Sequence, residues 1–226
     1  VNVQDSPDWL KNKLKAIGVR PINNIVDATN YILHDLGQPL HAFDADKISG
    51  GKIIVGNLPE GTTFKTLDEV ERKLSGNELM IADASGGLCI AGVFGGINSG
   101  VTSTTKNIFL ESAYFDSVLV RKAARFHGLH TDSSFRFERG TDPEMTITAL
   151  DKAVKLITEI AGGKAEATYV DFYPTKVENK KTELSYTYLN TLAGNVIAKD
   201  VVKRILNDLQ IATVAEDGDV LTVEVP

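Results

Sequence analysis

The stretch Arg20–Asp44 reads RPINNIVDATNYILHDLGQPLHAFD and combines helically spaced apolar residues with a high density of polar ones. The spacing predicts a helix that begins near Asn23 or Asn24 and ends at Gly37, because glycine readily adopts the left-handed conformation of a helix end. Pro39 then predicts an extended segment. Polar groups this dense beside strong apolar positions favour a lined pocket over a solvated face.

The polar residues of this stretch are the first candidates for a functional site. On a helix, Asn23, Asp27 and Asn30 lie near one face, and His41 follows on the extended segment. Such a set can hold a water molecule and orient a carbonyl group. The alternative is structural, with Asn23 and neighbouring amides capping the helix and an arginine paired with an acid. The candidates are Arg20, Asn23, Asn24, Asp27, Thr29, Asn30 and His41.

Composition limits the class of protein. With 226 residues, 42% apolar and 24% charged, the chain can form one large domain or two smaller ones. The net charge of -6 argues against a nucleic-acid binder that relies on a basic surface, but not against a module that receives an RNA end held elsewhere. The apolar runs are too short to span a bilayer, and no secretory signal opens the chain.

The single cysteine, Cys89, cannot form an intrachain disulfide and lies in a pattern typical of a buried strand. We therefore expect a cytoplasmic protein without membrane association. The chain begins at Val1 and ends at Pro226 in the middle of continuing patterns, so we also expect a piece of a longer protein.

The pattern elsewhere predicts an α+β fold with mixed or antiparallel sheets flanked by helices, followed by a small truncated α/β module. Ser6 and Pro7 predict the start of a first helix that Gly18 ends. Strands are predicted at 52–55, 62–67, 79–83, 88–94, 108–113 and 165–173, and helices at 116–125 and 142–160. After a polar linker at 175–181, strands are predicted at 183–186, 211–214 and 220–225, and helices at 188–192 and 200–209.

Three further motifs carry polar or glycine residues that could serve chemistry. Gly95 and Gly96 follow a strand pattern and either admit a ligand close to the backbone or form a tight turn. Glu111 interrupts a buried run, so its carboxylate needs a partner, either an internal cation or a ligand hydroxyl. The segment 127–140 is rich in hydroxyls and basic residues, which predicts either phosphate contact or a solvated face. His127 and His130 lack the companions of a zinc site.

These motifs, in this order and spacing, resemble the beta chain of bacterial phenylalanyl-tRNA synthetase. The motifs SPDWL at Ser6–Leu10 and FERGTDP at Phe137–Pro143 also look like that family's pattern. The resemblance implies a tRNA-editing domain over residues 1–174, a linker at 175–181, and the first part of a winged-helix-like module over 182–226.

The resemblance implies an activity: hydrolysis, by a positioned water, of tyrosine wrongly esterified to tRNA(Phe). Glu111 would accept a hydrogen bond from the tyrosine phenol, helped by backbone groups near Gly95. Thr131 and Ser133 would line the amino-acid pocket, although the family pattern has alanine where this chain has Ser133. The residues that would orient the ester, the terminal ribose and the water are Arg20, Thr29, Asn30 and His41.

The family also implies partners and cofactors of the parent enzyme. That enzyme ligates phenylalanine to tRNA(Phe) with ATP and magnesium, as a heterotetramer with an alpha subunit. For this chain we expect contact with the tRNA acceptor end, and no cofactor or metal site of its own. The alternative is a non-catalytic RNA-binding or subunit-scaffold module that has lost editing.

Overall fold

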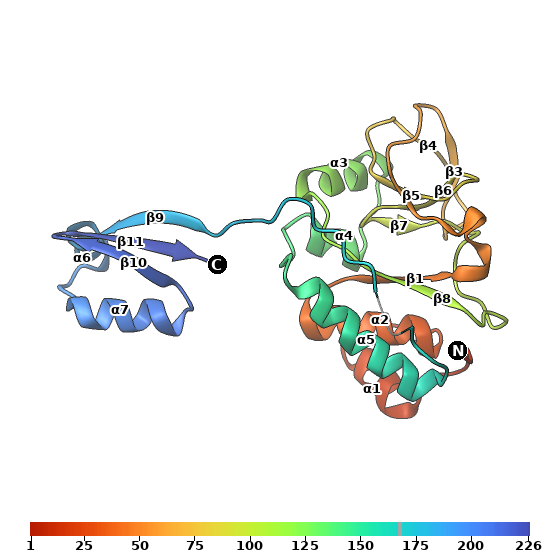
Figure 1. Cartoon of the computed structure of the whole chain (residues 1–226), viewed down its shortest axis with the longest axis horizontal. Helices are drawn as coiled ribbons and strands as arrows, with labels where there is room; N and C mark the ends of the chain where they lie inside the picture. The colour runs from red at the N-terminus through yellow and green to blue at the C-terminus, as the bar shows by residue number, and fades with distance from the viewer. Residues whose placement is uncertain (167–168) are drawn as a thin grey trace. The chain divides into compact units, whose positions relative to one another are not determined.

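The computed structural model describes residues 1–166 and 169–226, which form two compact units, Val1–Tyr169 and Val170–Pro226 (Figure 1). None of the helices described is long and apolar enough to cross a membrane. The domain limits at 174 and 182 stay a prediction. Strand β9 (Lys180–Ser185) begins within the segment 175–181 that was predicted as a linker.

The first unit combines helices with antiparallel strands, which confirms the predicted α+β class. Its helices are α1 (Asp8–Ala16), α2 (Asn24–Leu36), α3 (Ser117–His127), α4 (Asp132–Phe137) and α5 (Met145–Ala161), with short 3-10 turns η1 (Ala45–Lys47) and η2 (Ser49–Gly51). Its strands are β1 (Leu40–Asp44), β2 (Ile54–Gly56), β3 (Thr63–Lys65), β4 (Glu71–Lys73), β5 (Met80–Ala82), β6 (Gly87–Ile90), β7 (Phe94–Gly95) and β8 (Ile108–Ser112). Strand β1 pairs with β8, β3 pairs with β4, and β2-β5-β6-β7 form a four-stranded sheet.

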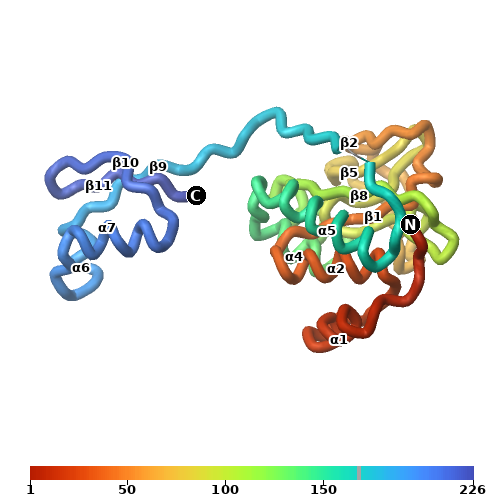
Figure 2. Tube along the Cα trace, turned by 60° about the horizontal axis from the view of Figure 1, so that its bottom comes forward, coloured from red at the N-terminus to blue at the C-terminus, as the bar shows by residue number. Residues whose placement is uncertain are grey.

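The β1–β8 ribbon separates two apolar cores (Figure 1). Side chains alternate across a strand, so Leu40 and Ala42 face one core while Phe43 faces the other. The first core holds α2 and α5, and Ala149 and Ala153 of α5 are fully buried in it. The second holds β5, β6, α3 and α4. Figure 2 follows α2 and α5 along the helical side of the ribbon.

The predicted course of the chain through α2 and β1 is confirmed. Asn23 caps α2 by accepting hydrogen bonds from two backbone N–H groups, and Gly37 ends the helix with φ 75°. Both signals are local, which explains why the sequence alone predicts them. The predicted start of α1 was wrong in one detail: the Ser6 hydroxyl donates to Asp27 at 2.5 Å and does not cap the helix.

Three other predictions needed correction. The strand predicted at 88–94 is broken by a turn at Gly92 (φ 68°), which separates β6 from β7. Strand β4 and helix α4 were not predicted. No strand forms at 165–166 or 169–173, and residues 167–168 of that predicted strand lie outside the described residues.

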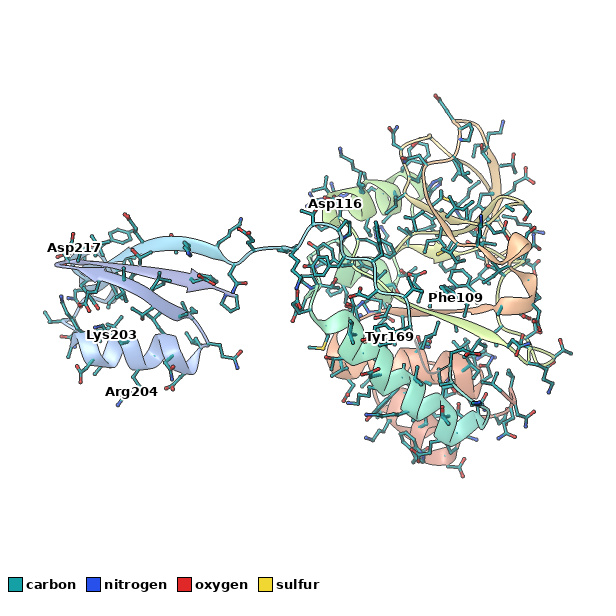
Figure 3. All side chains as sticks on the ribbon, viewed as in Figure 1. Phe109, Asp116, Tyr169, Lys203, Arg204 and Asp217 are labelled. Carbon is teal, nitrogen blue, oxygen red and sulfur yellow. The ribbon has the colours of Figure 1, made fainter. Side chains whose placement is uncertain are left out.

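The second unit contains β9 (Lys180–Ser185), α6 (Tyr186–Ala193), α7 (Lys199–Asp208), β10 (Ala212–Asp217) and β11 (Val220–Val225). Its sheet has the order β10-β11-β9, and the predicted hairpin at Asp217–Gly218 is confirmed. Lys203 of α7 pairs with Glu216 of β10, and Figure 3 labels Lys203 beside Arg204 on that helix. A cavity of ≈ 410 Å³ is lined by Leu184, Tyr188, Leu189, Leu192, Ala193, Ile197, Val202, Ile205 and Leu206.

Asn24 yields a first prediction about stability. Its fully buried amide accepts from the N–H of Gln4 and donates to the carbonyls of Asn2 and Ile160. Asn24→Ala leaves these backbone groups unpaired, so we expect the free energy of unfolding to fall by about 3 kcal/mol. The cap variant Asn23→Ala should cost only about 1 kcal/mol. Urea unfolding, followed by the fluorescence of the single tryptophan, measures both changes. Equal losses of stability in the two variants would contradict the larger structural role assigned to Asn24.

Candidate functional site

His41 and Glu111 are direct cross-strand neighbours in the β1–β8 ribbon. Directly opposed residues of an antiparallel pair project from the same face, so both side chains point towards the second core. Phe43 and Phe109 are the next opposed pair on that face, with ring centroids 6.1 Å apart. The imidazole of His41 packs edge-on against Phe43, with ring centroids 4.4 Å apart. Figure 3 labels Phe109 on this ribbon.

Gly95 lies on the neighbouring strand β7, close to the same histidine. A Cβ atom placed on Gly95 would stand 3.1 Å from Cε1 of His41 and 3.0 Å from Cδ1 of Leu67. Gly95 is paired with Cys89 of β6, whose thiol is buried. The missing side chain at Gly95 is therefore what leaves room for the imidazole and the leucine.

Burial sets the charges of this group. It raises the pKa of Glu111 to about 8 and lowers the pKa of His41 to about 4. Burial, and secondarily the Glu111 carboxylate, raises the pKa of the Cys89 thiol well above its ordinary value. Near pH 7 the three groups are thus mainly a neutral acid, a neutral imidazole and a thiol.

The Oε2 atom of Glu111 is buried and has no hydrogen-bond partner in the structure. A buried polar atom without a partner is rare, because it forgoes hydration without replacing it. A carboxyl in this state can donate or accept a hydrogen bond with a ligand hydroxyl. The internal ion pair considered for Glu111 does not form among the described residues.

Thr131 is tied to the same part of the molecule. It is the N-cap of α4 and donates its hydroxyl to the carbonyl of Val93, two residues before Gly95. Ser134 completes a capping box with it, so the threonine is held from both sides. Ser133 lies in the first turn of the same helix and is partly buried.

The remaining predicted residues are not joined to this group by hydrogen bonds or ion pairs. Arg20 is exposed on the connection between α1 and α2, and Asn30 is partly buried on α2. The hydroxyl of Thr29 donates to the carbonyl of Val26 at 2.8 Å within the helix. Asp27 is fully buried and accepts from the N–H of Ile22, so its role is structural.

The structure also assigns contacts to the histidine-rich segment. His127 lies 3.0 Å from the carboxylate of Glu78, and both side chains are buried. Burial alone would raise the pKa of Glu78, but the N–H of Ser75 and other hydrogen bonds bring it below the ordinary value. No group of three metal-binding side chains occurs in the described part of the chain.

A family model described as the B3/4 domain matches residues 1–162. The chain belongs to the B3/4 domain family. The match covers the first unit almost completely, including every candidate site residue named from the sequence.

Relatives match along the whole chain. This chain is 53% identical to the phenylalanine--tRNA ligase beta subunit of Bacteroides thetaiotaomicron and 51% identical to that of Bacteroides fragilis, over 226 residues in each case. The beta subunit of Geobacter metallireducens is 42% identical over 225 residues. In all three, the alignment covers 100% of this chain and 28% of the relative. The resemblance predicted from the sequence is thus confirmed, and the chain spans about 28% of the length of these relatives.

One similar solved structure is an N-terminal fragment of the phenylalanyl-tRNA synthetase beta-subunit from Pyrococcus horikoshii. It aligns with a TM-score of 0.44 and 18% identity, covering 89% of this chain and 59% of that one.

The structure adds residues to this candidate site that the sequence did not predict. Leu67 lies beside Gly95 although it follows a separate strand, and Phe43 supports the imidazole of His41. Cys89 was predicted only as a core residue, yet its thiol responds to the charge of Glu111. The signal for Leu67 and Cys89 is tertiary, since pairing between segments brings them to the site, whereas Phe43 follows His41 by two residues on the same strand.

Glu111 gives a prediction about pH. Its folded-state pKa, about 8, lies above the ordinary value of 4.5, so its contribution to stability is complete below pH 4.5 and is lost as pH rises towards 8. Glu111→Gln removes this dependence. The free energy of unfolding of the variant, relative to wild type, should therefore rise by about 1.4 kcal/mol per pH unit between pH 5 and 7.5.

His41 acts in the opposite sense, because its pKa falls from 6.5 to about 4 and its contribution is lost as pH falls. Wild-type stability alone would therefore partly hide the slope below pH 6.5, whereas the difference between variant and wild type isolates Glu111. Urea unfolding at half-unit pH steps measures it. Glu71→Gln, at an exposed position on β4, is the matched control, and a parallel pair of curves for Glu111→Gln would contradict a buried neutral acid.

Proposed function

We propose that the first unit hydrolyses tyrosine wrongly esterified to tRNA(Phe), using a positioned water. The observation that carries this proposal is the unpaired, buried Oε2 of Glu111 next to the neutral imidazole of His41. The family membership and the beta-subunit relatives support the same assignment.

The unpaired oxygen provides selectivity for tyrosine over phenylalanine. A tyrosine phenol would pair with the carboxyl of Glu111, whereas phenylalanine would leave that oxygen unpaired in a desolvated place. A site built to bind a hydroxyl rejects the analogue without it far more strongly than an apolar pocket rejects an added hydroxyl. This asymmetry is what a proofreading site needs, because correctly charged tRNA must survive.

His41 would act on the water rather than on the substrate. A neutral imidazole near pH 7 can accept a hydrogen bond from water and orient its lone pair towards the ester carbonyl. Its low pKa makes it a weak base, so orientation is its main contribution. In the proposal Arg20, Thr29 and Asn30 orient the ester and the terminal ribose, and Thr131 and Ser133 line the amino-acid pocket.

The RNA part of the substrate has a suitable surface next to the pocket. Helix α3 exposes Arg121, Lys122 and Arg125, for which the described structure records no ion pair, and Phe126 is 61% exposed beside them. Cations that hold phosphates and an aromatic ring that stacks on bases are the usual means of binding single-stranded RNA. Helix α3 packs against α4, whose first residues border the pocket.

The same proposal extends to the complete protein. It would be a phenylalanine--tRNA ligase that uses ATP and magnesium at a synthetic site elsewhere, assembles with an alpha subunit, and works in the cytoplasm. A second candidate is a non-catalytic RNA-binding or scaffold module. This candidate is favoured because, in the described part of the chain, neither Arg20 nor Asn30 forms a hydrogen bond or ion pair with His41 or Glu111.

Deacylation of tyrosine-charged tRNA(Phe) tests the proposal. The complete ligase should release tyrosine well above the uncatalysed rate and spare phenylalanine-charged tRNA. Glu111→Ala and His41→Ala should each lower kcat/KM for release by about 100-fold, since one removes the phenol partner and the other the group that orients water. Release is measured as acid-soluble radioactive tyrosine, with the 226-residue chain assayed in parallel.

Two results decide between the candidates. Loss of release in both variants, with aminoacylation unchanged, supports editing at this pocket. Release by the wild-type ligase that is no faster than the uncatalysed reaction favours the scaffold instead.

The cations of α3 give a separate prediction. Replacing Arg121, Lys122 and Arg125 with glutamine should raise KM for charged tRNA and leave kcat nearly unchanged. The salt dependence of binding should weaken by about one unit of slope for each phosphate that the protein no longer neutralises. Fluorescence anisotropy with tRNA at several salt concentrations measures the slope.

The matched control replaces three exposed lysines elsewhere in the unit, Lys15, Lys155 and Lys164, with glutamine. Equal weakening by the control and α3 variants would show only a general effect of net charge.

A further inference from the structure

A turn between β3 and β4 places a half-exposed leucine over the glycine of the site. The main-chain N–H of Leu67 donates to the carbonyl of Gly95 at 3.0 Å, and the N–H of Ile97 donates to the carbonyl of Lys65 at 3.1 Å. Thr66 and Gly96 form a further bridge between the same segments. The turn is therefore bonded to β7 and the residues that follow it, next to Gly95 of the candidate site.

The turn is also rigid in itself. Both guanidinium nitrogens of Arg72 donate to the carboxylate of Asp68 at 2.8 Å, and Thr66 donates to the same carboxylate at 2.5 Å. The hydrogen bonds from Arg72, followed by that from Thr66, hold the pKa of Asp68 far below its ordinary value. Glu69 adopts a left-handed conformation with φ 64°, which completes the tight turn.

This hydrogen-bonded turn carries the apolar side chain of Leu67, which is only half buried. Leu67 is 46% exposed, although a Cβ atom placed on Gly95 would stand 3.0 Å from its Cδ1 and one placed on Gly100 would stand 3.6 Å from its Cδ2. His41 flanks Gly95 from another strand. Phe109, 40% exposed, projects from the face of the ribbon that also carries Glu111. Two half-exposed apolar side chains thus border the partly buried pair of His41 and Glu111.

We propose that Leu67 is a specificity-determining wall of the pocket, and that it contacts the ring of the bound aromatic amino acid and limits substitution on that ring. This inference rests on the proposed tyrosine-ester site. Glu111 would recognise the phenol at one end of the ring, and Leu67, held by the Asp68–Arg72 pair, would define the space beside it. An apolar side chain on an immobile turn suits this role, because little side-chain or loop freedom is lost on binding.

The test compares two esters, tyrosine and 3-iodotyrosine, each attached to tRNA(Phe) and presented to the complete ligase. Wild type should prefer tyrosine because the iodine meets Leu67. Leu67→Ala should raise KM for the tyrosine ester about 10-fold, because the ring then packs less well, and shift the preference towards 3-iodotyrosine by about 10-fold or more. Leu67→Met, which keeps the volume, should restore the wild-type preference. Val70→Ala, at a half-exposed residue of the same turn, is the matched control.

The results separate this inference from the proposed function. If wild type hydrolyses tyrosine ester but Leu67→Ala keeps the wild-type preference, the leucine is not a wall, and editing stands. If wild type hydrolyses neither ester, the proposed editing activity is wrong. Calorimetry of the 226-residue chain with tyrosinamide and 3-iodotyrosinamide then tests whether Leu67 contacts a bound aromatic ring. Tyrosinamide binding whose preference shifts in Leu67→Ala supports the wall. An unshifted preference, or no binding, overturns it.

Discussion

The pairing of β1 with β8 is the constraint on which the first unit depends. One face of this ribbon closes the helical core and the other closes the β-rich core, so each residue along it must face the correct side. A slip of β1 by one residue would send His41 into the helical core and Leu40 and Ala42 out of it. The apolar cost of that slip fixes the register. His41 and Glu111 therefore stay opposite each other because the apolar residues beside them must remain buried in their cores.

The unit contains two histidine–glutamate pairs, and their surroundings give them different states. Glu78 accepts hydrogen bonds from the backbone at Ser75, which stabilise its charged form next to His127. Glu111 has no such donors, so burial favours the neutral acid, and the same burial keeps His41 uncharged. The Glu78–His127 pair thus links two segments of the fold, whereas the Glu111–His41 pair retains a hydrogen-bonding oxygen that has no partner among the described residues.

The sequence predicted those parts of the fold whose signals are local. Asn23 and Gly37 mark the limits of α2 by cap chemistry, and the predicted strand containing Glu111 is observed. The six-residue α4 is too short for periodicity to reveal, and β4 consists of three charged residues, so it shows no alternation of apolar and polar positions. At the site, sequence motifs identified His41, Gly95 and Glu111 individually, but their closeness follows from pairing between segments far apart in the chain. Leu67 carries no motif, so only the fastened turn identifies it.

The hydrogen bonds around the His41–Glu111 pair leave one buried polar atom of the described structure without a partner. Most buried polar atoms near the site are already paired: Thr131 with Val93, Thr66 with Asp68, and the thiol of Cys89 with neighbouring carbonyls. These hydrogen bonds hold the segments around the His41–Glu111 pair in place in the folded chain. The unpaired Oε2 of Glu111 is different, because a buried polar atom without a hydrogen bond costs free energy that no other group of the described chain offsets. Because the neighbouring polar groups are already paired with one another, none of them in the described structure satisfies that oxygen.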